Sequence, residues 1–301
     1  MLIVRSILCP VDFSDGSQLA LRLAIALAHH RQVALTVLTA LDPLLAEAAR
    51  TRLGMDLAKT EVEPALREFV GGVVPAGALW IPPIVFEVRV GEPSEVILDA
   101  ARARPGALIV MGTQGLGGFR KLLLGSTTER VLRRTETPVL AVPPHATGSA
   151  VLDAAGARID LRRILVATDF SEAAAAAAEW AVTAAQDFTV PLLFAHVVQP
   201  MTVAPQWGAY AAESADAQAA GARVRLEEWA GGFCGDKPCD TIVSLGRPAE
   251  SIASMADERQ AGLIVLGLAS DQGRFAQRPG SIAYQILCLS KVPVLVVPGH
   301  P

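Results

Sequence analysis

The sequence predicts an α/β protein built from two tandem, doubly wound domains. Two observations carry this prediction: the chain repeats itself once, and each half alternates short apolar runs with longer Ala/Leu-rich segments. The short runs are apolar throughout rather than alternating, which is typical of parallel strands buried on both faces. Strands that alternate with helices indicate right-handed crossovers, with helices on both faces of a parallel sheet.

Four motifs of the first half recur in the second half in the same order. Their offset drifts only from 157 to 155 residues, as between Ile7-Leu-Cys-Pro-Val-Asp-Phe-Ser14 and Ile164-Leu-Val-Ala-Thr-Asp-Phe-Ser171, or between Pro138-Val-Leu-Ala-Val-Pro143 and Pro293-Val-Leu-Val-Val-Pro298. A repeat this long indicates a duplicated domain, since solenoid repeats are about 20–50 residues long. We place the domains at 1–150 and 151–301, because the small and polar segment 145–150 suits a linker.

The elements of the first domain follow in order from this pattern. The β-branched apolar runs predict strands, and the Ala/Leu-rich segments between them predict helices. The expected strands are 3–9, 33–41, 84–90, 107–111 and 139–142, and the expected helices are 17–29, a segment within 45–70, 94–103 and 126–134.

Composition and charge exclude several classes of protein. Hydrophobic residues make up 51% of the chain, which is ample for two packed cores. The net charge of −4 argues against a nucleic-acid-binding surface, which would carry a basic excess. We expect no membrane span and no signal peptide, because charged residues interrupt every apolar stretch before it reaches about 18 residues. The expected location is therefore the cytoplasm.

The four cysteines suggest packing more than chemistry. Cys9 and Cys288 lie in apolar runs and are expected in the cores. Cys234 and Cys239 have four residues between them, which is not a usual zinc or thioredoxin spacing. A redox or metal role for this pair is the minor alternative.

A glycine loop follows the apolar run 107–111. Gly112 and Gly115 are followed by nine residues and then by Gly125 and Ser126. Glycines let backbone N–H groups approach an anion, and a helix that begins at Ser126 would direct its free N–H groups at the same anion. Ser126-Thr-Thr-Glu129 also matches a capping box. The loop therefore predicts a phosphate site, although the same glycines could simply form a turn and a cap.

This loop resembles the nucleotide-binding signature of the universal stress protein family. Ile7-Leu-Cys-Pro-Val-Asp-Phe-Ser14 resembles the family's first strand and Thr137-Pro-Val-Leu-Ala-Val-Pro143 its last. With the repeat, the resemblance covers nearly the whole chain as a tandem universal stress protein. It implies a five-stranded sheet of order 3-2-1-4-5 in each domain, with the ligand crevice where strands 1 and 4 part.

The resemblance also implies ATP as the ligand, with or without Mg²⁺, and it assigns roles to individual residues. Asp12 would accept hydrogen bonds from ribose, although its position also suits a helix N-cap. The other cofactor-binding residues that it implies in the first domain are Pro10 and the backbone of Ala40 beside adenine, Met111 and Gly112 near the base and α-phosphate, and Gly115, Gly125, Ser126 and Thr127 at the phosphates. Arg120 and Lys121 are expected to be solvated loop charges rather than phosphate ligands.

The second domain departs from the signature. Gly267 takes the place of the first glycine, but Ser270 replaces the second. Nine residues then separate Ser270 from Gly280 and Ser281, as in the first domain. The corresponding nucleotide residues would be Asp169, Val197, Gly267, Gly280 and Ser281. Because the Cβ of Ser270 restricts close phosphate approach, we expect this domain to bind nucleotide weakly or not at all.

The leading functional hypothesis is an ATP-binding protein of stress response or signalling, with the nucleotide as a regulatory or structural ligand. No Gly-Lys pair occurs, so a P-loop is excluded and at most slow ATP hydrolysis is expected. One alternative is an interaction scaffold that binds no nucleotide. Another is an adenine-nucleotide hydrolase-type enzyme. Enzymes of that group need a Ser-Gly-Gly loop after the first strand, and the segment 12–17 of this chain is not such a loop.

Assembly is expected to follow from the last strands. Universal stress domains commonly dimerise through this strand, whose edge is otherwise unpaired. Here 139–142 and 294–297 can pair within one chain as an internal pseudo-dimer, on which a homodimer could be built. The expected partners are an adenine nucleotide and a protein that the sequence does not identify, with no nucleic acid and no membrane.

Overall fold

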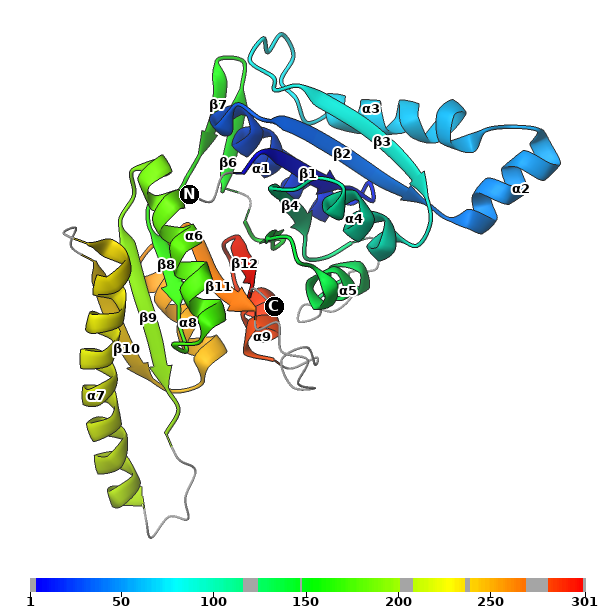
Figure 1. Ribbon diagram of the computed structural model, residues 1–301. Helices are drawn as coiled ribbons and strands as arrows, with labels where there is room; N and C mark the ends of the chain where they lie inside the picture. Colours follow the sequence, from blue (N-terminus) through cyan, green and yellow to red (C-terminus); the bar gives the residue numbers. More distant parts are fainter. Residues whose placement is uncertain are drawn as a thin grey trace. The chain divides into compact units, whose positions relative to one another are not determined.

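The computed structural model describes residues 4–115, 124–146, 148–200, 208–235, 239–268 and 281–299. Contacts divide the chain into two compact units, Ile3–Asp160 and a second unit that begins at Leu161. The boundary expected from the sequence, at residue 150, falls at the start of a β-hairpin that the first unit contains. The two units are described separately (Figure 1).

The first unit is a parallel five-stranded sheet. Its strands are β1 (Ser6–Pro10), β2 (Ala34–Leu41), β3 (Ile84–Val90), β4 (Ala107–Gly112) and β5 (Val139–Val142). They lie in the order β5-β4-β1-β2-β3, which confirms the predicted order 3-2-1-4-5. β1 is central, because Ser6 is in register with Ala34 on one side and with Ala107 on the other. Ile7, Leu8 and Ile109 are fully buried, as expected for strands covered on both faces.

Helices cover both faces of this sheet. They are α1 (Asp15–Arg31), α2 (Pro43–Leu53), the π-helical turn η1 (Ala58–Val62), α3 (Glu63–Gly71), α4 (Pro93–Arg102) and α5 (Ser126–Arg134). α1 packs on β1 and β4, whereas α4 and α5 pack against each other. Right-handed crossovers place α4 and α5 on the face opposite α1, as Figure 1 shows. The prediction of a doubly wound domain is therefore confirmed.

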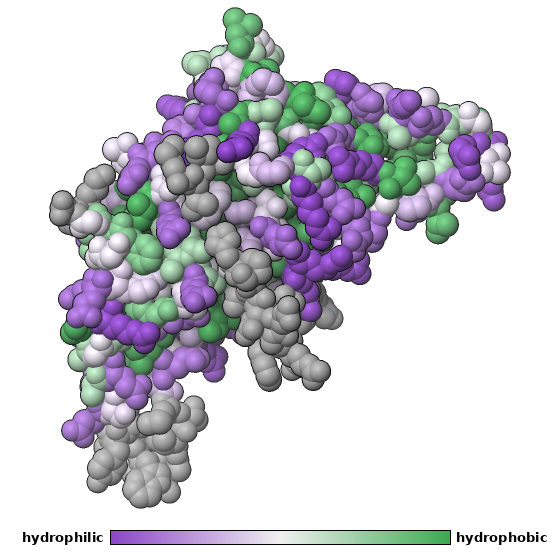
Figure 2. All heavy atoms as spheres, in the orientation of Figure 1, coloured by the Kyte–Doolittle hydropathy of each residue, from purple (hydrophilic) through white to green (hydrophobic). Residues whose placement is uncertain are grey.

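The single helical segment expected within 45–70 is three elements. α2 ends at Leu53, and the following Gly54 caps it in the left-handed conformation, with a φ of 63°. Leu44, Leu45 and Leu53 of α2 are exposed, and hydrophobic surface is visible among the charged residues of this region in Figure 2. The leucines of α2 therefore add little to the core.

Directly after the expected linker 145–150, the chain forms an antiparallel hairpin of β6 (Ala150–Asp153) and β7 (Gly156–Ile159). The Asp153 carboxylate closes its turn by accepting hydrogen bonds from the backbone N–H groups of Ala155 and Gly156. The hairpin packs on α1, and the Trp80 indole donates a hydrogen bond of 2.9 Å to the carbonyl of Asp153. It therefore belongs to the first unit rather than forming a loose linker.

The second unit repeats the architecture. Its strands are β8 (Ile164–Ala167), β9 (Leu192–Val198), β10 (Asp240–Leu245), β11 (Leu263–Leu268) and β12 (Val294–Pro298). They are parallel in the order β10-β9-β8-β11-β12, the same 3-2-1-4-5 order. The helices are α6 (Glu172–Phe188), the 27-residue α7 (Gly208–Cys234), α8 (Pro248–Glu258) and α9 (Ile282–Leu289). No helix among the described residues is both long and apolar enough to cross a membrane.

Candidate nucleotide site

The candidate site lies where the chain leaves β1 and β4 at the carboxyl edge of the first sheet. These strands are neighbours, and the chain continues from β1 into α1 and from β4 into the glycine loop. This edge is the topological switch point of the 3-2-1-4-5 sheet, where open α/β sheets bind ligands. The geometry therefore brings the two sequence motifs to one place.

Asp12 braces the start of α1 without capping it. Its Oδ1 accepts hydrogen bonds from the Ser14 backbone N–H at 3.1 Å and from the Ser14 hydroxyl at 2.5 Å. Ser14 is the N-cap, because its hydroxyl oxygen accepts from the Ser17 N–H at 3.2 Å. The alternative role of Asp12 as the helix cap is therefore wrong. Asp12 remains exposed, with a carboxylate that is held in a fixed orientation.

Phe13, between these two residues, has a φ of 63°. The left-handed conformation is rare for a bulky side chain, and such strain persists where neighbouring contacts impose it. The ring of Phe13 meets that of Phe69 from α3 edge-on at 5.5 Å. Phe170 takes the same conformation in the second unit, with a φ of 65°. Both units therefore share this turn, which the sequence alone did not reveal.

The glycines of the loop are required by close packing. A Cβ at Gly112 would lie 2.7 Å from the carbonyl oxygen of Gly16, and a Cβ at Gly115 would overlap Oδ2 of Asp12. A Cβ at Gly125 would lie 3.3 Å from the carbonyl oxygen of Thr113. Gly112 and Gly115 thus bring the loop backbone against α1 and Asp12, while Gly125 lets the two ends of the loop approach each other. Gly16, which belongs to no predicted motif, also has no room for a Cβ, because the carbonyl of Gln114 lies there.

The helix start at Ser126 is confirmed, but the predicted capping box does not form. Gly125, not Ser126, is the N-cap of α5, and it makes no side-chain cap. Glu129 instead forms an ion pair with Arg133, with 2.6 Å between Oε1 and Nη2. Ser126 is exposed and Thr127 half-buried in the first turn, while the Thr128 hydroxyl donates to the carbonyl of Gly112 at 2.8 Å. The N-terminus of α5 is therefore tied to the end of β4.

The remaining predicted residues line the same edge. Pro10 ends β1 opposite Leu38 of β2, and Ala40 lies two positions further along β2. Pro10 and Ala40 are half-buried, whereas Met111 is buried at the end of β4. Arg120 and Lys121 lie outside the described residues.

An ion-pair ladder joins α5 to α4. Arg130 contacts Glu92 at 2.8 Å, and Arg134 donates to Glu95 at 3.0 Å. Burial raises the pKa of Glu92, but hydrogen bonds from the Ser94 hydroxyl, the Glu95 N–H and Arg130 outweigh it and hold the pKa below its ordinary value of 4.5. The hydrogen bond from Arg134 lowers the pKa of Glu95. Glu92 is also the N-cap of α4, so the same carboxylate caps α4 and binds Arg130 of α5.

The second unit keeps part of this arrangement. Asp169 Oδ1 accepts from the Ser171 N–H at 3.0 Å, and Ser171 caps α6. Gly267 lies against the Ala173 backbone, where a Cβ would overlap. Ser281 is the N-cap of α9, its hydroxyl accepting from the Tyr284 N–H at 3.3 Å. Val197 is half-buried in β9, and Gly280 and Ser270 lie outside the described residues.

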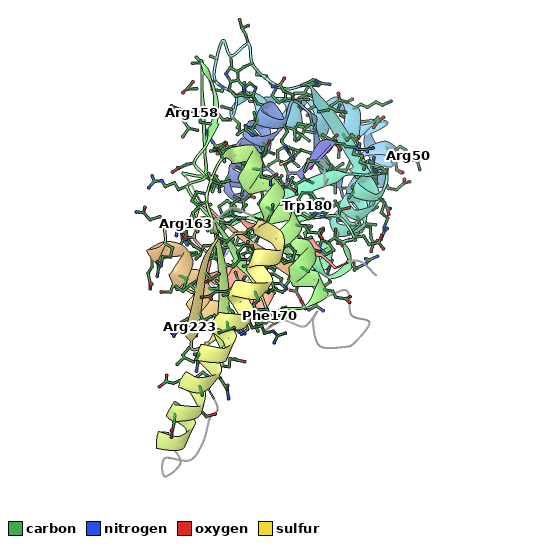
Figure 3. All side chains as sticks on the ribbon, turned by 60° about the vertical axis from the view of Figure 1, so that its left-hand side comes forward. Arg50, Arg158, Arg163, Phe170, Trp180 and Arg223 are labelled. Carbon is green, nitrogen blue, oxygen red and sulfur yellow. A yellow bond between two sulfur atoms is a disulfide. The ribbon has the colours of Figure 1, made fainter. Side chains whose placement is uncertain are left out.

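An aromatic cluster borders Asp169, and no sequence motif predicted it. Phe170, labelled beside α7 in Figure 3, lies 4.6 Å from the His196 ring and 5.9 Å from the Trp229 ring. The Arg225 guanidinium lies over the face of Phe170 at 4.1 Å, a cation–π contact. The His196 Nδ1 is 2.8 Å from the Thr168 carbonyl, which fixes the orientation of the ring. Side chains therefore crowd the end of β9 in the second unit.

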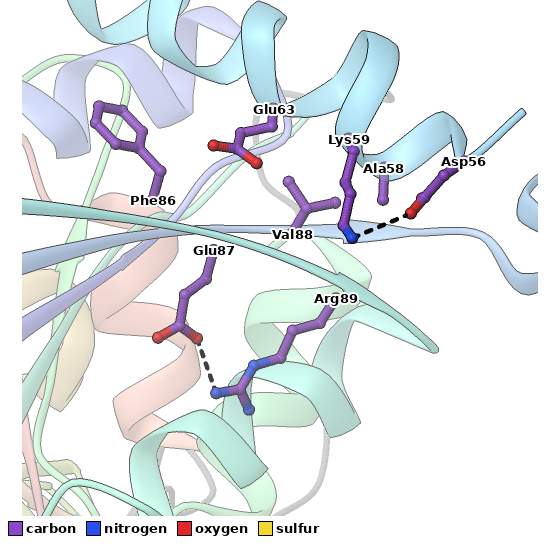
Figure 4. Close-up of a pocket in the computed structure, with 8 residues that line it drawn as sticks. All are labelled: Asp56, Ala58, Lys59, Glu63, Phe86, Glu87, Val88 and Arg89. Carbon is purple, nitrogen blue, oxygen red and sulfur yellow. Dashed lines mark ion pairs between the residues drawn. The ribbon is translucent and has the colours of Figure 1, made fainter.

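A separate pocket of about 430 Å³ lies between β3 and η1 in the first unit (Figure 4). Its charged lining residues are already paired: Lys59 with Asp56 at 3.7 Å, Arg89 with Glu87 at 2.8 Å, and Glu63 with Arg67. These pairs leave little charge for a ligand, so the switch-point site remains the candidate. Within the described ranges, no cluster of three or more His, Cys, Asp or Glu side chains could hold a metal ion.

Comparison with known proteins agrees with this fold and repeat. The model of the universal stress protein family matches residues 4–143 and again 160–298. A universal stress protein of Methanocaldococcus jannaschii is 32% identical over 142 residues, which cover 46% of this chain and 81% of that protein. One from Thermus aquaticus is 33% identical over 146 residues, covering 46% of this chain and 98% of that protein.

A solved structure extends the similarity to both units. The crystal structure of a universal stress protein from Archaeoglobus fulgidus has a TM-score of 0.66 and 22% identity, and covers 99% of each chain. At this identity it supports the fold. Together with the family match over both halves, it shows that the chain belongs to the universal stress protein family and carries two of its domains in tandem.

Proposed function

We propose that the first unit binds ATP as a regulatory or structural ligand, in stress response or signalling, with little or no hydrolysis. The observation that carries this proposal is the packing of Asp12 against Gly115 at the switch point, beside the N-terminus of α5. A fixed carboxylate, a backbone without side chains and a helix N-terminus are the groups that a ribose and a chain of phosphates require.

Each group would have a distinct role in binding. The Asp12 carboxylate has lone pairs left after its bonds to Ser14, so it can accept hydrogen bonds from ribose hydroxyls. Gly115 would present its backbone N–H group to the phosphates. The Gly125 N–H already donates to the Thr113 carbonyl at 2.7 Å, so Gly125 would contribute the absence of a side chain beside the phosphates. Ser126 is exposed in the first turn of α5, where its hydroxyl and the positive end of the helix dipole favour an anion. A bound Mg²⁺ would add charge neutralisation on the phosphates.

Hydrolysis is a poor fit to this site. A base for the attacking water needs a free, correctly placed acceptor. The Asp12 carboxylate accepts from Ser14 through Oδ1, and in the proposed complex its remaining lone pairs accept from the ribose, which leaves no acceptor for the attacking water. ATP would then act by favouring one conformation or interface over another.

We propose that the second unit binds nucleotide weakly or not at all. Phe170, His196 and Trp229 fill space next to Asp169, whereas the described part of the first unit shows the Phe13–Phe69 contact alone in the equivalent turn. Ser281 also uses its hydroxyl to cap α9, whereas Ser126 caps nothing among the described residues. A scaffold without nucleotide is the second candidate, favoured by the exposed leucines of α2. The internal pseudo-dimer and the homodimer stay predictions.

The proposal is tested by measuring what the purified protein carries and what it hydrolyses. Nucleotide extracted from the protein is identified by mass spectrometry, and ADP release is followed with excess ATP and Mg²⁺. We expect an adenine nucleotide at no more than one per chain and turnover far below the typical enzyme range of about 1–10³ s⁻¹. Rapid turnover would favour the hydrolase alternative, and failure to bind added ATP would favour the scaffold.

A further inference from the structure

Cys234 and Cys239 form a disulfide in the second unit. Cys234 is the last residue of α7, and Cys239 directly precedes β10. Their Cα atoms are 6.4 Å apart, within the usual range for a disulfide. Between them, Gly235 has a φ of 57°, a left-handed conformation that turns the chain at the helix end. The cross-link therefore fixes the junction between the longest helix of the unit and its edge strand.

The cross-linked cysteines differ from Cys9 in accessibility. Cys9 is fully buried in β1, and burial raises the pKa of its thiol, so it remains protonated and unreactive. Cys234 and Cys239 are both partly exposed. A small thiol can therefore reach the disulfide, which is the condition for thiol–disulfide exchange.

The disulfide closes a short loop, so its contribution to the stability of the fold is expected to be small. Stabilisation by a disulfide grows with the number of residues that it encloses, and here the two cysteines are five positions apart. α7 is in addition held by contacts with β9 and β10 that do not involve the sulfur atoms. The reduced protein is therefore expected to stay folded.

A continuous row of rings leads from the disulfide to the Asp169 turn. Phe233, next to Cys234, lies 4.7 Å from the Trp229 ring and 6.4 Å from the Phe194 ring. Trp229 in turn meets Phe170, which follows Asp169 in the chain. Release of the end of α7 would loosen Phe233 first, and Trp229 is positioned to report it.

We propose that Cys234 and Cys239 form a reversible dithiol–disulfide site, reduced by small thiols, whose state is transmitted through Phe233 to the aromatic cluster around Trp229. In the reduction, a thiolate attacks one sulfur, the Cys234–Cys239 bond breaks, and the other cysteine leaves as a thiolate that takes up a proton. A second thiol then attacks the mixed disulfide. Two thiols are oxidised to one small disulfide, and the protein gains two electrons and two protons. The reverse exchange with a small disulfide restores the bond.

The test is a redox titration of the full-length native protein with reduced and oxidised glutathione. Free thiols are trapped with iodoacetamide at each ratio and located by peptide mapping, while Trp emission is recorded in parallel. We expect both cysteines to change together between oxidised and alkylated forms, reversibly, with a parallel change in emission. Cys288→Ser should leave the titration unchanged, and Trp229→Phe should remove the emission change but not the alkylation.

Three outcomes would overturn the proposal. A pair that is alkylated at every ratio forms no disulfide, and a pair that resists every ratio is a static cross-link. Alkylation without any change in Trp229 emission would remove the link to the aromatic cluster. Cys234→Ser should leave Cys239 alkylated or glutathionylated at all ratios, but the titration of the unmodified sequence decides the matter even where that variant fails to fold.

Discussion

Asp12 and Gly115 share one small space: a Cβ on Gly115 would overlap Oδ2 of Asp12, although the two residues are separated by most of the first domain. The contact joins the loop after β1 to the loop after β4. Since Oδ1 of the same carboxylate accepts two hydrogen bonds from Ser14, Asp12 can move aside only by weakening those bonds. The proposed ribose and phosphate contacts are therefore built around this pair.

Gly115→Ala should weaken ATP binding while leaving the fold intact. The added methyl group displaces the Asp12 carboxylate, and loss of a hydrogen bond to a charged group costs about 1.5–3 kcal/mol, or about ten- to a hundredfold in affinity. Calorimetric titration with ATP measures the change. The control is Gly148→Ala, because a Cβ at Gly148 meets no atom within 4 Å. Equal affinities for the two variants would show that the loop does not bind phosphate.

Ser126→Ala and Ser281→Ala should have opposite effects, although the serines hold equivalent sequence positions. Ser281 caps α9, so its loss should lower the free energy of unfolding by about 1 kcal/mol. Ser126 makes no cap, so Ser126→Ala should change stability by less than about 0.5 kcal/mol but reduce ATP affinity. Urea unfolding and ATP titration of both variants separate the two effects. A stability loss confined to Ser126→Ala would contradict this assignment.

Gly112→Ala and Gly267→Ala should both destabilise the protein. In each unit the added Cβ would meet the backbone at the start of the first helix, at Gly16 in one case and at Ala173 in the other. Overpacking of this kind costs about 1–3 kcal/mol. Gly221→Ala is the control: its Cβ meets nothing within 4 Å and it lies inside α7, so this variant should gain up to about 1 kcal/mol. Thermal unfolding of the three variants gives the comparison.

Glu92→Gln should flatten the acid limb of the stability profile. The pKa of Glu92 is lowered in the folded protein, so its ionised form contributes stability above 4.5, and this contribution is lost as the pH falls through the lowered pKa. The melting temperatures of the wild type and of Glu92→Gln should therefore differ at pH 7 and converge below pH 4.5. Glu250→Gln, which removes an exposed pair with Arg247, should show a much smaller difference. A difference that persists unchanged in acid would exclude the ionised Glu92 as its source.

The repeat and the apolar runs were enough to predict the sheets, because parallel strands buried on both faces have a composition that few other elements share. Capping was less predictable. Ser126 and Glu129 have the capping-box spacing, yet Gly125 takes the N-cap position while Thr128 is tied to Gly112. The second domain has Tyr284 in place of the glutamate, yet there Ser281 does cap its helix, α9. Tertiary contacts of the loop, rather than the local pattern, decide which residue begins each helix.

Other features depend on contacts that no local pattern records. The β6–β7 hairpin is held by contacts with α1 and by the hydrogen bond from Trp80 to Asp153, and no local motif predicted it. The crowding of Phe170 by His196 and Trp229 arises from β9 and α7, two elements that lie well beyond Phe170 in the sequence. The sequence motif includes Gly112 and Gly115, and their packing against Gly16 and Asp12 is the physical reason for them.

The most direct measurement is an ATP titration of the wild type, Asp12→Ala and Asp169→Ala by calorimetry. Both substitutions remove the carboxylate that braces a capping serine, so they perturb the two units in the same way. We expect one ATP per chain for the wild type and for Asp169→Ala, and no detectable binding for Asp12→Ala. Binding that survives in a folded Asp12→Ala variant, or that is lost in Asp169→Ala instead, would contradict the assignment of the nucleotide site to the first unit.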